Sequence, residues 1–145
     1  MLALSLLFCV TLIVGCGPKR PEGLPNLVGC VLTFQYEDGT PVDSATVSLV
    51  PEDANLQQWS ISGATNASGV TTISTNAEFV GAPAGKYKVV IRKVELLPTK
   101  EKDEYGEPVM ETRPLIAEEF SNAGKTPLSL EIGSSAVKET FKVAK

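Results

Sequence analysis

The chain has 145 residues, a net charge of -4 and no histidine. A mildly acidic chain without a basic patch disfavours nucleic acid as a partner. The lack of histidine removes the commonest general base and metal ligand, and with it histidine-dependent hydrolase triads and ordinary zinc sites. We therefore expect no enzyme activity, no cofactor and no metal site.

The first segment is an apolar run from Leu2 to Val14 that holds no charge. It is shorter than the roughly 20 apolar residues of a membrane span, and it lacks the polar spacing of an amphipathic helix. Its end, Ile13-Val14-Gly15-Cys16, resembles the lipobox of bacterial lipoproteins, whose cysteine takes a diacylglycerol before the preceding residues are cleaved off. The resemblance implies a signal peptide over 1–15 and a lipid on Cys16. It places the protein in the cell envelope, on the periplasmic face or the cell surface.

Residues 16–27 follow as the anchor cysteine and a Pro/Gly-rich stretch, which predicts a tether. The remaining residues, 28–145, suffice for one domain. Of the three cysteines, Cys9 lies in the implied signal peptide and Cys16 would carry the lipid. Cys30 then has no intramolecular partner, and its place in an apolar alternation predicts a buried core residue.

From Val28 the apolar residues alternate with polar ones, beginning with Cys30, Leu32, Phe34 and Tyr36. The same period of two recurs in later segments: Ala45–Leu49, Trp59–Ile61, Thr71–Ile73, Tyr87–Ile91, Leu128–Ile132 and Phe141–Val143. Turn-forming residues separate the segments, as in Asp38-Gly39, and no segment has sustained helical periodicity. The sequence predicts an all-β fold, a seven-stranded antiparallel Greek-key β-sandwich.

The segment Lys93–Glu119 departs from this pattern. It holds eight acidic residues and four basic ones. The net charge of the segment is therefore -4, the same as that of the whole chain. Pro98, Pro108 and Pro114 disfavour both a helix and a central strand, so we predict one long irregular acidic loop. The loop is either a solvated excursion or a docking surface for a cationic or protein partner. The predicted interaction surface consists of Tyr105, Val109, Met110, Glu101, Asp103, Glu104 and Glu107.

Three stretches in order carry a second resemblance: Gly29–Val50 with Asp38-Gly39-Thr40-Pro41-Val42, then Ser62–Gly69, then Ala82–Val89. They resemble the carboxypeptidase regulatory-like, transthyretin-like domain. The tail from Phe120 to Phe141 resembles that of small lipoproteins of this type in planctomycete-type bacteria. The resemblance implies a prealbumin-like or Ig-like sandwich without family catalytic residues. The histidines of transthyretin-like hydroxyisourate hydrolases are missing from this chain.

Acidic side chains gather in two places, at Glu37, Asp38 and Asp43 and at Glu52-Asp53. Hard cations prefer such oxygen ligands, but the EF-hand spacing is missing and Asp38-Gly39 is already explained as a turn. We predict no metal site here.

The single tryptophan, Trp59, stands beside Gln57 and Gln58. An exposed aromatic next to amides would suit stacking on a sugar ring, whereas a buried one would contribute to the core, and we favour the core role.

Two classes of function remain open. The first is a noncatalytic structural or protein-interaction module of the envelope. The alternative is a carbohydrate-binding module of the envelope, with Trp59 as the glycan contact. The expected partners are the membrane, through the lipid on Cys16, and an envelope protein or polysaccharide that the sequence does not identify.

Overall fold

The computed structural model describes residues 17–145, and the implied signal peptide and Cys16 lie outside the described residues. Within these residues the chain is all-β, with thirteen strands in four sheets and two short 3-10 helices. None of the described helices is long and apolar enough to cross a membrane.

The larger sheet has six strands, all joined by antiparallel pairing. Its strands are, in spatial order, β12 (Ser129–Ile132), β9 (Gly85–Arg92), β3 (Thr46–Pro51), β4 (Ile61–Ala64), β6 (Ser74–Thr75) and β7 (Phe79–Val80). The alternation predicted for β9 is confirmed, because Tyr87, Val89 and Ile91 are fully buried. One face of this sheet therefore faces the core.

The second sheet has three strands, β13 (Val137–Val143), β2 (Cys30–Tyr36) and β5 (Val70–Thr72). β5 pairs with β2 antiparallel, but β13 runs parallel to β2, so a purely antiparallel fold is a wrong prediction. The reason is the connection: β12 belongs to the larger sheet, and residues 133–136 take the chain across to the smaller sheet instead of turning back beside β12.

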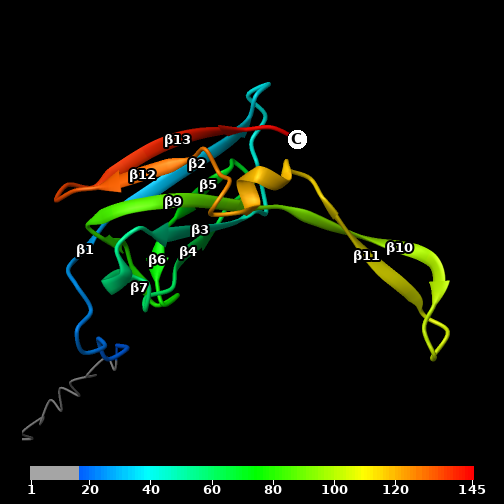
Figure 1. The fold of residues 1–145 in the computed structure, drawn as a ribbon, viewed down its shortest axis with the longest axis horizontal. Coiled ribbons are helices and arrows are strands. Elements are labelled where there is room, and N and C mark those ends of the chain that lie inside the picture. Colours follow the sequence, from blue (N-terminus) through cyan, green and yellow to red (C-terminus); the bar gives the residue numbers. More distant parts are fainter. Residues whose placement is uncertain (1–16) are drawn as a thin grey trace, which may run out of the picture.

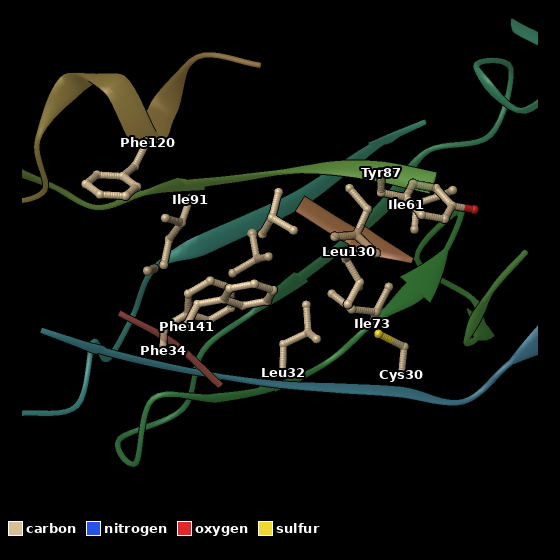
Figure 2. Packing of buried hydrophobic residues seen from close by; sticks show 14 of the residues in the cluster. Cys30, Leu32, Phe34, Ile61, Ile73, Tyr87, Ile91, Phe120, Leu130 and Phe141 are labelled. Atoms are coloured by element: carbon tan, nitrogen blue, oxygen red, sulfur yellow. The ribbon is translucent and has the colours of Figure 1, made fainter. Parts of the chain in front are cut away.

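The apolar core lies between these two sheets (Figure 2). The rings of Phe34 on β2 and Phe141 on β13 stack with their centroids 5.5 Å apart. Cys30 is buried in the same cluster, which confirms its predicted core role. The packing of two sheets over one apolar layer is the sandwich-like arrangement that the alternation indicated.

The structure has thirteen described strands, not seven. The predicted segments correspond to β2, β3, β4, β5, β9, β12 and β13. Two of the additional strands, β1 (Leu27–Val28) and β8 (Ala82–Pro83), form a small pair of their own. The 3-10 helices are η1 (Ala54–Leu56) and η2 (Glu118–Ser121).

Part of the predicted tether is folded. The guanidinium of Arg20 donates to the carbonyl oxygens of Leu24, at 3.1 Å, and Pro25, at 2.6 Å. The backbone N–H of Leu24 also donates to the Pro21 carbonyl. Residues 20–25 therefore form a turn, which shortens the reach of the tether.

The predicted irregular loop is wrong as well, because it forms a hairpin of β10 (Val94–Lys102) and β11 (Pro108–Pro114). The backbone N–H of Leu115 donates to the Lys93 carbonyl, so Lys93 and Leu115 form a hydrogen-bonded pair. In an antiparallel ladder such pairs alternate with pairs that are not hydrogen-bonded. Pro98 and Pro114 fall in the intervening pairs, opposite Met110 and Val94. No ladder bond is lost at either proline, and a two-stranded ribbon has no central strand for proline to disrupt.

Candidate docking site on the hairpin

The β10–β11 hairpin projects away from the sandwich as a separate arm (Figure 1). Every residue of β11 is exposed, and so are most residues of β10. A lone two-stranded ribbon is marginally stable in water, so its base and its tip need local support.

At the base, the ammonium of Lys93 lies 2.7 Å from Oδ1 of Asp43, in the loop before β3. The hydrogen bond from Lys93 is the main cause that lowers the pKa of the Asp43 carboxyl. One step further out, Arg113 pairs with Glu95 across the two strands. Two of the four basic residues of the segment are thus already neutralised by nearby carboxylates.

At the tip, Asp103 organises the turn. Its Oδ1 accepts hydrogen bonds from the backbone N–H groups of Tyr105 and Glu107, both at 2.9 Å. Gly106 takes a positive φ of 83°, which a residue with a side chain rarely adopts. Asp103 therefore has a structural role, while Tyr105 remains 82% exposed.

The register of the hairpin separates its side chains into two faces. One face, here called the uncharged face, consists of Val94, Leu96, Pro98, Met110, Thr112 and Pro114. Leu96 is 60% exposed and Met110 is 50% exposed on this face. The opposite face carries Glu95, Leu97, Val109, Glu111 and Arg113. Over residues 94–98 and 110–114 the charged strand residues therefore lie off the uncharged face, whereas beyond the register shift Lys102 pairs with Pro108.

A cavity of about 410 Å³ lies at the foot of the hairpin. Its lining comprises Ile91, Arg92, Lys93, Val94, Thr112, Pro114, Ile116, Glu118 and Ser121. Three of these residues, Val94, Thr112 and Pro114, also belong to the uncharged face. The uncharged face thus forms part of the cavity wall, and Arg92, Lys93 and Glu118 bring charged groups to the rest of the lining.

The structure brings the predicted interaction residues onto one hairpin but not onto one face. Glu101 lies on β10, and Glu104 and Glu107 lie in the exposed tip. Val109 and Met110 are consecutive on β11 and so point to opposite sides. Sequence reasoning missed Leu96 and Thr112, although the alternation of Val94, Leu96 and Pro98 was a usable signal for a strand face.

Trp59 lies in the loop between η1 and β4 rather than at the start of a strand. It is half-buried and packs against the core, as the favoured interpretation held. Its Nε1 is buried and has no hydrogen-bond partner among the described residues. The side chain also borders a shallow groove with Gln57 and Ser48.

Two further acidic side chains, those of Asp38 and Asp53, accept local hydrogen bonds. Oδ1 of Asp38 accepts from the backbone N–H of Thr40 at 2.8 Å, and hydrogen bonding from Thr40 is the main cause that lowers the pKa of Asp38. Asp53 caps η1 through the backbone N–H of Asn55. Within residues 17–145, no group of three or more His, Cys, Asp or Glu side chains is placed to hold a metal ion.

Neither the known protein-family models nor the curated proteins include a match to this sequence. Among solved structures, the chain is similar to a 9R-lipoxygenase from Cyanothece PCC8801, at 16% identity and a TM-score of 0.37. The similarity covers 87% of this chain but 18% of the lipoxygenase chain. A similarity at this level carries no argument about fold or activity.

Proposed function

We propose that this protein is a lipid-anchored, noncatalytic protein of the bacterial envelope, whose sandwich presents the β10–β11 hairpin as a docking arm for a protein partner. The sandwich is of the transthyretin-like, Greek-key type, and Cys16 carries the lipid. The observation that supports the docking role is the uncharged face, which is exposed along a projecting arm and forms part of a cavity wall.

Exposing this apolar surface to water costs free energy. A loop that only kept the protein soluble would not have this cost. Leu96 and Met110 keep half or more of their surface in water. Contiguous exposed apolar residues on a folded protein mark interaction sites. A partner that covers the face removes this apolar surface from water, at roughly 25 cal/mol for each Å².

The position of the arm suits a protein anchored at its N-terminal end. The first described residues, from Gly17, and the hairpin lie at opposite ends of the molecule in Figure 1. With a lipid on Cys16, the hairpin points away from the anchored end. The nine residues of β10 give the arm a reach of roughly 30 Å at the usual rise of a strand.

Two experiments in the native host test the proposal. Metabolic labelling with a clickable fatty acid tests the anchor: we expect the label on the wild-type protein and none on Cys16→Ala. Label retained on Cys16→Ala contradicts the anchor.

For the docking role, a photo-crosslinking amino acid at position 110 is compared with the same group at Glu131, an exposed residue of β12. We expect discrete adducts from position 110 alone. The same adduct pattern from both positions, or none from position 110, contradicts the docking role.

A glycan-binding role for Trp59 is the alternative, and the shallow groove that Trp59 lines with Gln57 favours it. Trp59 is the only tryptophan, so its fluorescence reports this site alone. A saturable change on addition of envelope polysaccharide supports the alternative, and an unchanged spectrum contradicts it.

A further inference from the structure

We infer that the outer edge of β11 accepts an extended segment of another protein as a third strand, and that this segment alternates apolar with basic residues. The inference rests on the proposed docking role of the hairpin and names the chemistry of its partner. It follows from the backbone groups, the side-chain faces and the charges of the arm.

In the part of the chain that the structure describes, the outer edge of β11 has unpaired backbone groups. The ladder bonds lie in the pairs 93–115, 95–113 and 97–111, so Met110 and Thr112 point their N–H and C=O groups outward. Within the described chain, no strand pairs with this edge of β11. Pro108 and Pro114 bound the edge and have no N–H to offer. The open stretch therefore has the length of one short strand.

The side chains then set the pattern of the partner. A residue paired with Met110 or Thr112 points its side chain to the uncharged face, where an apolar group extends that face. The residue between them stands beside Glu111 on the opposite face. Glu111 makes no ion pair among the described residues, whereas Arg113 is neutralised by Glu95. A lysine or arginine at the intermediate position complements Glu111.

The edge of β10 suits this partner less well. Pro98 interrupts its outward N–H groups, and the register shifts between Pro98 and Lys102. Lys100 and Lys102 also lie on its distal half and repel a cationic segment. At the start of β11, by contrast, the neighbouring residues of the tip are acidic: Glu104 and Glu107.

The cavity at the foot of the hairpin receives one end of the segment. β11 ends at Pro114, which lines the cavity together with Val94 and Ile116. An apolar side chain at the end of the segment nearest Pro114 packs against this apolar part of the cavity wall, while Arg92, Lys93 and Glu118 line the rest. A volume of about 410 Å³ holds a large aliphatic or aromatic side chain.

The probes are three fluorescein-labelled peptides of equal length. In the first, Val and Lys alternate, and in the second, Val and Glu alternate. The third has the composition of the first, but all its Val residues precede all its Lys residues. Binding to the full-length protein in neutral detergent is measured by fluorescence anisotropy, with detergent alone as the blank. We expect saturable binding of the alternating Val–Lys peptide and at least tenfold weaker binding of the other two. Equal binding of all three, or no binding of the Val–Lys peptide, overturns the inference.

Two matched proline variants test which edge is used. Thr112→Pro and Leu96→Pro each remove one outward N–H and no ladder bond. We expect Thr112→Pro to bind at least tenfold more weakly than Thr112→Val, which keeps the backbone N–H. We expect Leu96→Pro to bind no more weakly than Leu96→Ala, because both variants lose the same apolar side chain and only the proline also removes the N–H of β10. Loss relative to these controls in Leu96→Pro alone, or in neither proline variant, overturns the assignment to β11.

A third variant does not depend on how the hairpin tolerates proline. Glu111→Lys should reverse the preference, so that the Val–Glu peptide binds more tightly than the Val–Lys peptide. An unchanged preference overturns the charge pattern. If the peptides fail while crosslinks from position 110 persist, strand addition is wrong and the docking role stands; if both fail, both are wrong.

Discussion

The ammonium of Lys93 lies 2.7 Å from the carboxylate of Asp43, a residue 50 positions earlier in the chain. Lys93 directly precedes β10, and Asp43 lies in the loop between β2 and β3. This ion pair therefore ties the base of the β10–β11 hairpin to the body of the sandwich.

The ion pair predicts an acid-dependent stability. Because the pKa of Asp43 is lowered in the folded chain, chiefly by the hydrogen bond from Lys93, the ionised carboxylate stabilises the fold above the unfolded pKa of about 3.9. This stabilisation is lost as the pH falls through the folded value. We expect Asp43→Asn to lower the melting temperature at neutral pH and to flatten its decline in acid. Thermal melts across the acid range, with Glu139→Gln as the exposed control, check this; an unchanged acid profile contradicts it.

Gly69 is required by the turn before β5. It has a φ of +74°, and a Cβ there would lie 2.3 Å from the backbone oxygen of Phe34. We expect Gly69→Ala to lower the free energy of unfolding by at least about 3 kcal/mol, because strain and a backbone clash add. Gly39 has a φ of +86° with nothing within 4 Å of a built Cβ, so Gly39→Ala should cost only about 1–2 kcal/mol. Urea unfolding of both variants checks this, and equal losses contradict the clash.

Phe141 on β13 and Phe34 on β2 are direct partners in the parallel pair of strands, and their stacked rings both lie in the core. Phe141→Ala should lower the free energy of unfolding by about 3–5 kcal/mol, the range for removal of a buried aromatic side chain. Lys142→Ala, at the next and exposed position, should change it by less than about 0.5 kcal/mol. Denaturant titration compares the two, and similar values would show that the end of β13 does not contribute to the core.

Burial raises the pKa of the Cys30 thiol to about 11, so almost no thiolate is present at pH 8. In a variant whose Cys9 and Cys16 are replaced by serine, we expect no reaction with a disulfide reagent until urea unfolds the domain. The absorbance of the released thiol measures the rate. Fast reaction of the native protein would show that the sheets open far more readily than their packing implies.

The local sequence was sufficient to predict the main strands of the sandwich and which of their residues face the core. Cys30, Leu32, Phe34 and Tyr36 alternate with more polar residues, and this period of two depends only on near neighbours along the chain. The turn that ends at Gly69 was also readable, because Asn66 and Gly69 have turn-forming chemistry of their own.

Strand direction was decided by the tertiary structure, because alternation is the same in a parallel and an antiparallel strand. Only the crossing between the two sheets made β13 parallel to β2.

The hairpin was decided in the same way. From the sequence alone, Pro98 and Pro114 disfavoured a strand. Whether a proline removes a ladder hydrogen bond, however, depends on its register with the partner strand. That register exists only after β10 and β11 pair. The uncharged face and the adjoining cavity form only when β10 and β11 pair, because each includes residues from both strands.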